Sequence, residues 1–144
     1  MPYLTLPDLY THLHPEVIEE ITREDDTIVE KAIDAAVSEA SMYLSRYNLV
    51  QLFGDSHTPP TITDEYLRSI VKTLACRHLT QLCGTGTHHD AVRASYADAL
   101  QALKAIMTGQ AQPTGWPYKG PDAPELPDGT AISWHSNPRR HNYY

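Results

Sequence analysis

The chain has 144 residues, 41% of them apolar and 20% charged, which fits one globular domain with a modest core and excludes disorder throughout. The formal net charge is -7, and residues 1–47 carry the whole excess because they hold ten acidic residues against three basic ones. This acidic part of the chain is therefore a poor surface for binding nucleic-acid phosphates.

The sequence carries no signal for export or for a membrane. The first residues lack the basic stretch and apolar run of a secretory signal, and no run of about 18 apolar residues is present to cross a bilayer. Cys76 and Cys83 lie seven residues apart in a helical pattern, roughly 10 Å along the axis, which is too far for a disulfide. We expect a reduced, cytoplasmic protein.

One or two short helices are predicted at the beginning of the chain. Thr5 with Asp8 forms a capping-box variant ahead of apolar residues that end at Leu13. Pro15 then occupies the first position of a second short turn or helix, where a missing backbone N–H costs little.

A long helix is predicted over residues 27–47. Thr27 with Glu30 forms a capping box at its start. Its apolar residues share one broad face at 100° per residue. They are Val29, Ala32, Ile33, Ala36, Ala40, Tyr43, Leu44 and Tyr47.

Two further helices follow a predicted loop. Gly54, Asp55 and Pro59-Pro60 indicate a loop over residues 48–61. Asp64 then caps a helix of about residues 64–82, and Asp90 caps one of about 90–108 that Gly109 ends. The predicted fold is all-α: a small bundle of two to three long helices with short N-terminal helices packed across them.

Residues 110–144 differ in character from the helical domain of residues 1–109. They contain six of the eleven prolines and both tryptophans, and only residues 130–134 fit a short extended piece. Large aromatic residues are unusual in a solvated tail, so we expect an extended arm whose aromatics contact a surface, on the parent domain or on a neighbouring subunit. Its candidate contact residues are Trp116, Trp134, Arg139 and Arg140. Two arginines are weak support for nucleic-acid binding.

Metal and catalytic chemistry are not predicted. Five potential ligands lie within fourteen residues, but no Cys-x-x-Cys or His-x-x-x-His pair occurs among them. They are Cys76, His78, Cys83, His88 and His89. His78 lies in an apolar stripe and is expected to be a hydrogen-bonded core histidine. No nucleophile-elbow, phosphate-loop or zinc-protease motif is present, so we predict no enzyme activity and no cofactor.

The cluster Tyr43-Leu44-Ser45-Arg46-Tyr47 is the most distinctive element of the helical domain. Tyr43 and Tyr47 are four residues apart and would share one helical face, with Arg46 beside them at the helix C-terminus, where a cation is favoured. The cluster is either the edge of the core or a subunit contact, because tyrosine and arginine are enriched in interfaces.

These residues carry a family resemblance. Tyr3-Leu4-Thr5 followed by Asp8-Leu9, the Tyr-Leu-x-Arg-Tyr cluster and the order of the helices over residues 1–109 resemble a small Mu-like prophage family of unknown function. Members of that family look like head-to-tail connector, or adaptor, proteins of tailed phages. The long Pro/Trp-rich tail and the His88-His89 pair depart from the family pattern.

The resemblance implies a structural protein that acts by assembly. Its subunits would form a ring beneath the portal, contact portal and tail proteins, and let DNA pass without specific binding, which an acidic wall would suit. It would occur in the host cytoplasm during assembly and then in the virion, without contacting a membrane. The predicted interface residues are Tyr43, Arg46, Tyr47, Trp116, Trp134, Arg139 and Arg140.

Two other functions remain open from the sequence. One is a monomeric helical module for protein binding or regulation, whose aromatic tail folds back on its own domain. The other, which we favour less, is a small metal-dependent enzyme.

Overall fold

The computed structural model describes residues 3–81 and 88–119 of the chain. These residues form helices and contain no β-strand, only an isolated bridge between Tyr47 and Tyr118. The elements in order are η1 (Leu6–Thr11), α1 (Pro15–Thr22), α2 (Asp26–Tyr43), α3 (Leu49–Phe53), α4 (Glu65–Thr80) and α5 (His88–Thr108). The predicted all-α class is confirmed.

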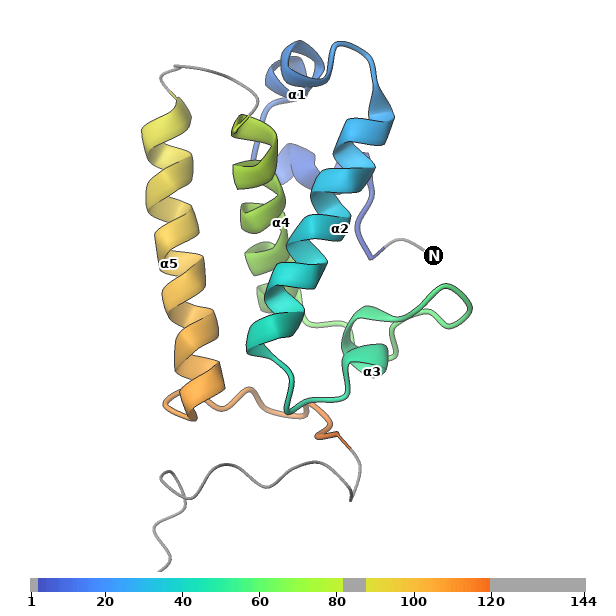
Figure 1. The fold of residues 1–144 in the computed structure, drawn as a ribbon, viewed down its shortest axis with the longest axis vertical. Helices are drawn as coiled ribbons and strands as arrows, with labels where there is room; N and C mark the ends of the chain where they lie inside the picture. Colours follow the sequence, from blue (N-terminus) through green and yellow to red (C-terminus); the bar gives the residue numbers. More distant parts are fainter. Residues whose placement is uncertain (1–2, 82–87, 120–144) are drawn as a thin grey trace, which may run out of the picture.

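Helix α4 is the centre of a three-helix layer. It lies between α2 and α5, with its larger interface against α2 (Figure 1). The 3-10 helix η1 and helix α1 both pack against α2 and α4, so the two short N-terminal elements cover one side of this pair. The predicted bundle of long helices with short N-terminal helices across it is therefore the observed architecture.

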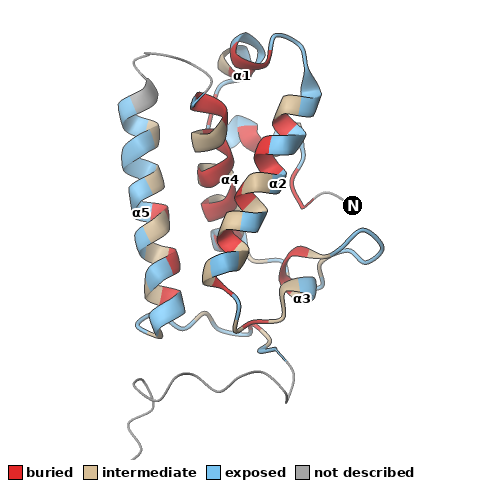
Figure 2. Cartoon of the chain, viewed as in Figure 1, coloured by how far each residue is buried: buried red, intermediate tan, exposed pale blue. Residues whose placement is uncertain are grey.

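The core is built from the faces that helical periodicity predicts. Half of the residues of α4 are buried, whereas most of the described residues of α5 are exposed (Figure 2). Each large aliphatic side chain removed from water contributes about 1.5–3 kcal/mol to folding. The buried residues of α4 are Leu67, Ile70, Val71, Leu74, Ala75, Cys76, Leu79 and Thr80, and those of α2 are Val29, Ala32, Ile33, Ala36 and Ala40.

Helix α2 begins one residue earlier than predicted, with a different cap. The Asp25 carboxylate accepts hydrogen bonds from the Thr27 backbone N–H at 3.1 Å and from the Thr27 hydroxyl at 2.6 Å, so the predicted Thr27–Glu30 capping box is wrong. Arg23 and Glu24, with φ of 51° and 67°, turn the chain between α1 and α2. After this turn Asp25 has the extended backbone that an N-cap needs.

Helix α2 also ends earlier than predicted. The sequence placed Tyr43 and Tyr47 on one helical face, but the helix ends at Tyr43 and the chain turns at fully buried Leu44. Asn48 then caps the short helix α3 by accepting a hydrogen bond from the Gln51 N–H at 3.2 Å. The prediction of a loop over residues 48–61 missed α3, because five residues are too few for a periodic pattern.

The remaining helix ends agree with the sequence to within two residues. Asp64 caps α4 by accepting hydrogen bonds from the backbone N–H groups of Tyr66 and Leu67 at 2.9 and 3.0 Å, as predicted. Helix α4 ends at Thr80 instead of 82. Helix α5 begins at His88, so the predicted Asp90 cap is wrong, and Asp90 lies in the first turn of the helix. Cys76 is buried and not in a disulfide, and Cys83 lies outside the described residues.

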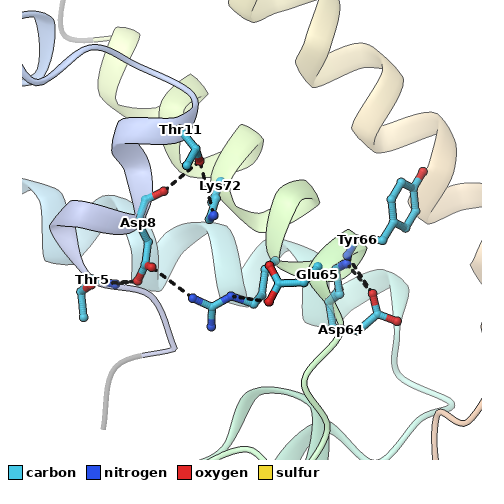
Figure 3. A network of polar contacts seen from close by, with 9 residues as sticks. Thr5, Asp8, Thr11, Asp64, Glu65, Tyr66 and Lys72 are labelled. Carbon is cyan, nitrogen blue, oxygen red and sulfur yellow. Dashed lines mark hydrogen bonds and ion pairs between the residues drawn. The ribbon is translucent and has the colours of Figure 1, made fainter.

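A polar network fastens η1 to α4 (Figure 3). The Asp8 carboxylate accepts hydrogen bonds from the backbone N–H and the hydroxyl of Thr5 at 2.7 and 2.8 Å, which confirms the predicted pairing of these two residues. Its other oxygen pairs with the Arg68 guanidinium at 3.2 Å. Lys72 also reaches the Thr11 hydroxyl at 3.4 Å. One carboxylate thus both caps η1 and joins it to α4.

Within the described residues, no helix has the length and apolar character needed to cross a membrane.

Candidate assembly interface

The segment 110–119 follows α5 and returns across the turn between α2 and α3; we call it the C-terminal strap. The Lys119 N–H donates to the Arg46 carbonyl at 2.9 Å, and the Asn48 N–H donates to the Pro117 carbonyl at 2.8 Å. Tyr47 and Tyr118 form an antiparallel bridge between these two bonds. In Figure 1 the strap is the orange segment that passes beneath the ends of the long helices.

Trp116 fixes the strap to the helical domain. Its side chain is 5% exposed, and its ring meets the Tyr47 ring edge to face with centroids 5.4 Å apart. Its Nε1–H donates to Asp64 Oδ2 at 2.8 Å, while Oδ1 of the same carboxylate caps α4. The sequence alone is compatible with contacts of the arm's aromatic residues to the parent domain or to a neighbouring subunit. For Trp116 the parent domain provides the surface.

Tyr47 is part of the core. It is 2% exposed, and the Tyr118 ring stacks on it with centroids 5.2 Å apart. Burial is the main cause that raises the pKa of Tyr47 above its ordinary value. Within the strap Trp116 is buried and Tyr118 is exposed, so a partner protein that approaches Tyr47 from this side meets Tyr118 first.

Arg46 interacts with a different helix end from the one predicted. Its guanidinium donates to the Met107 carbonyl in the last turn of α5, whereas the sequence placed it at the C-terminus of α2. The unpaired carbonyls of a helix C-terminus carry partial negative charge, so the cation is stabilised there. Arg46 and Tyr43 are both half-buried. Trp134, Arg139, Arg140 and the predicted extended piece at 130–134 lie outside the described residues.

Exposed apolar side chains occur at the start of α4, at the end of α5 and in the strap. Tyr66 is 62% exposed, Tyr118 is 61% exposed and Met107 is 41% exposed. A hollow of about 240 Å³ lies between the start of α4, the end of α5 and the strap, and Tyr66 and Trp116 line it. Figure 3 shows the Tyr66 ring extending from the start of α4. We call Tyr66, Met107 and Tyr118, together with this hollow, the strap surface.

A second polar cluster joins the three long helices. Glu39 of α2 accepts a hydrogen bond from the Tyr96 hydroxyl of α5 at 2.6 Å and lies 3.0 Å from His78 Nε2 of α4. The hydrogen bond to Glu39, together with burial, raises the pKa of Tyr96 to about 12. The guanidinium of Arg77 lies 5.8 Å from the Tyr96 ring centroid.

The predicted hydrogen bond of His78 is confirmed, although the residue is half-buried. Sequence reasoning missed Glu39 as its partner. The available signal was the position of Glu39 beside Ala36 and Ala40, on the apolar side of α2.

The described residues contain no group of three His, Cys, Asp or Glu side chains that could hold a metal ion. Cys83 and the side chains of His88 and His89 are not described, so the metal prediction rests on the sequence for these three residues.

The fold and the strap surface define a class: a small all-helical protein whose C-terminal strap folds back on the bundle. Residues 3–129 match the model of the family described as Bacteriophage Mu, Gp36, and the chain belongs to that family. Comparison with curated proteins finds no match, and comparison with solved structures finds none either. The resemblance to a Mu-like phage family is therefore confirmed, and the protein is a phage protein.

Proposed function

We propose that the chain is a head-to-tail connector subunit that acts by assembling into a ring between the portal and the tail, without catalysis. Membership of the Bacteriophage Mu, Gp36 family supports this role because the proteins that this sequence resembles look like connectors. The observation in the structure that carries the proposal is the strap surface, where Tyr66, Met107 and Tyr118 are exposed around one end of the bundle.

The strap surface has the composition of an interface. Tyrosine and methionine are enriched in protein–protein contacts, and the hollow between α4, α5 and the strap gives a partner side chain a place to insert. Trp116 and Tyr47 pack against each other and are buried beneath this surface. A preformed surface of this kind loses little conformational entropy when a partner binds.

The acidic residues favour a position beside the DNA channel. Glu16, Glu19 and Glu20 of α1 are exposed, as is Glu24 in the turn that follows. Walls of like charge do not hold the phosphate backbone, so DNA passes such a surface without specific binding. Our proposal places this acidic side towards the centre of the ring and the strap surface against a portal or tail protein.

The proposal is tested with the full chain and portal rings of the phage that encodes it. We expect co-sedimentation with the portal, additional ring density in negative-stain images, and the protein among the components of purified virions. If the chain binds neither portals nor purified tails and is missing from virions, the connector proposal is wrong.

Paired variants test the strap surface itself. We expect Tyr118→Ala together with Tyr66→Ala to weaken portal binding by about 30-fold, because two interface tyrosines that contribute about 1 kcal/mol each change the binding free energy by about 2 kcal/mol. Tyr10→Ala is the control, because Tyr10 is an exposed tyrosine on η1, outside the strap surface, with 41% of its surface accessible. Equal binding by both variants, with unchanged circular dichroism, would place the interface elsewhere.

A monomeric binding or regulatory module is the second candidate, and one observation favours it. The strap already covers Tyr47 with Trp116 of the same chain, which is the fold-back arrangement expected of that module. A mass that stays monomeric in the presence of portal rings, combined with capture of another single protein, would support this candidate over the connector.

A further inference from the structure

A groove lies between residues 4–6 and the first half of α2, with a volume of about 500 Å³. Leu4, Val29 and Ile33 form its apolar floor, and half-buried Leu6 lies beside them. This groove is separate from the strap surface, with which it shares no lining residue.

One edge of the groove is acidic. Asp26, Glu30 and Asp34 line it and are exposed. They are spaced four residues apart, so they stand above one another on one side of α2, where neighbouring like charges repel. Among the residues that the structure describes, none forms an ion pair with these three carboxylates. A basic occupant would therefore relieve this repulsion.

The last part of the chain has the matching chemistry. Residues 129–144 contain Arg139 and Arg140 and no acidic residue, and Trp134 lies five residues before the first arginine. An arginine pair fits an edge of carboxylates, and an aromatic ring fits an apolar floor. The excess negative charge of the chain lies in residues 1–47, so this edge is where a basic segment of the same protein is attracted.

The segment is long enough to reach the groove within one chain. The strap holds the backbone at Lys119, and the fifteen steps from there to Trp134 span up to roughly 50 Å. Helix α2, with 18 residues, is only about 27 Å long. Because the tether is long enough, binding within the chain is favoured over binding to a second copy at ordinary protein concentrations.

We propose that the free subunit holds residues 129–144 of its own chain in this groove, with Trp134 on the apolar floor and Arg139 and Arg140 against Asp26, Glu30 and Asp34. The groove is then an intramolecular docking site that keeps the basic arm on the body of the subunit. The inference does not depend on the connector role, since it concerns the isolated chain.

Acrylamide quenching of tryptophan fluorescence in the full chain tests this docking. Trp116 is buried, so the quenchable signal reports Trp134, and Trp134→Phe supplies the Trp116 baseline. We expect Trp134 to be shielded to the same extent at low and high protein concentration. High salt should release the arm and make Trp134 accessible to acrylamide, because salt screens the charge pairs at the exposed edge of the groove.

Neutralising the edge should release the arm. We expect Asp26→Asn, Glu30→Gln and Asp34→Asn together to shift the ratio of docked to free arm by about tenfold, since each exposed charge pair lost changes such a ratio by about threefold. The matched control is Glu16→Gln, Glu19→Gln and Glu20→Gln on α1, which removes the same charge from exposed positions outside the groove. In this control, acrylamide should quench the fluorescence of Trp134 to the same extent as in the wild type.

A charge exchange distinguishes pairing from a general effect of net charge. Arg139→Glu with Arg140→Glu should expose Trp134, and adding Glu30→Lys with Asp34→Lys should shield it again. Equal quenching of the wild type and the neutralised edge would overturn the proposal. Shielding that increases with protein concentration would overturn it too, because the occupant would then be the arm of a second copy.

Discussion

Replacement of Trp116 by alanine tests whether the strap is part of the folded domain. A buried tryptophan removes about 150–250 Å² of surface from water, which gives an upper bound of about 4–6 kcal/mol for its transfer. Its hydrogen bond to the Asp64 carboxylate adds about 1.5 kcal/mol. Once the ring is removed, the strap can detach from the bundle. The decrease in the free energy of unfolding therefore cannot exceed the free energy with which the strap binds the bundle.

We therefore expect Trp116→Ala to lower the free energy of unfolding by about 3 kcal/mol and the melting temperature by about 10 °C. Urea denaturation followed by far-ultraviolet circular dichroism measures the free energy of unfolding, and it does not depend on the tryptophan fluorescence that the substitution changes. Trp116→Phe keeps a ring against Tyr47 but loses the Nε1–H donor, so it should cost about 1–1.5 kcal/mol.

Tyr118→Ala is the control within the same segment, because Tyr118 is mostly exposed and only stacks on Tyr47. It should cost less than about 1 kcal/mol. If Trp116→Ala costs no more than Tyr118→Ala, the strap contributes nothing to folding, and Trp116 acts only as a contact for a partner.

Three further predictions concern ionisation and backbone strain. The pKa of Tyr96 and that of Tyr3 are raised from 10.0 to about 12, mainly by the hydrogen bond to Glu39 for Tyr96 and by burial for Tyr3. Their stabilising contribution is therefore complete below pH 10 and is lost as the pH rises towards 12, which denaturation at alkaline pH measures. Burial raises the pKa of the Cys76 thiol to about 12, so alkylation followed by mass spectrometry should find this thiol unreactive in the native protein. Gly54→Ala should destabilise the protein by more than about 1 kcal/mol, because φ is +76° and the added Cβ would lie 2.7 Å from a backbone oxygen.

Each of these three has an outcome that contradicts it. In the Tyr96→Phe variant the free energy of unfolding should fall less between pH 10 and pH 12 than in the wild type. If it falls equally in both proteins, ionisation of Tyr96 does not contribute to the loss of stability. Native Cys76 that reacts as fast as a denatured sample would mean that the core opens readily there. Gly115→Ala is the control for Gly54→Ala, since its φ is +81° but no atom lies within 4 Å of the added Cβ. If both substitutions lower the free energy of unfolding equally, the positive φ accounts for the whole effect and the close contact at Gly54 contributes nothing.

The sequence predicted the fold class and the core because three helices have clear periodic faces. Asp64 was predictable as a cap because a good helix pattern follows it directly. Asp25 was missed because Thr27 also suits a cap, and only the left-handed turn at Arg23 and Glu24 decides between them. Local sequence carries little information about that turn, since neither residue favours a positive φ.

The interface prediction depended on contacts that are distant in sequence. Tyr47 appeared to continue the helical face of Tyr43, but its environment is set by Trp116 and Tyr118, about 70 residues further along the chain. The Arg46 guanidinium likewise meets the end of α5. Periodicity cannot report such pairs, because they form only when the strap returns to the turn between α2 and α3.

The antiparallel pairing of the strap determines how the protein bears load. The bonds Lys119 N–H to Arg46 O and Asn48 N–H to Pro117 O lie side by side across two chain segments that run in opposite directions. A pull on the chain beyond Lys119 reaches these bonds and the Tyr47–Tyr118 stack before it reaches α5. We therefore expect tension on the arm to be transmitted to the junction of α2 and α3, with the three long helices packed until the strap detaches.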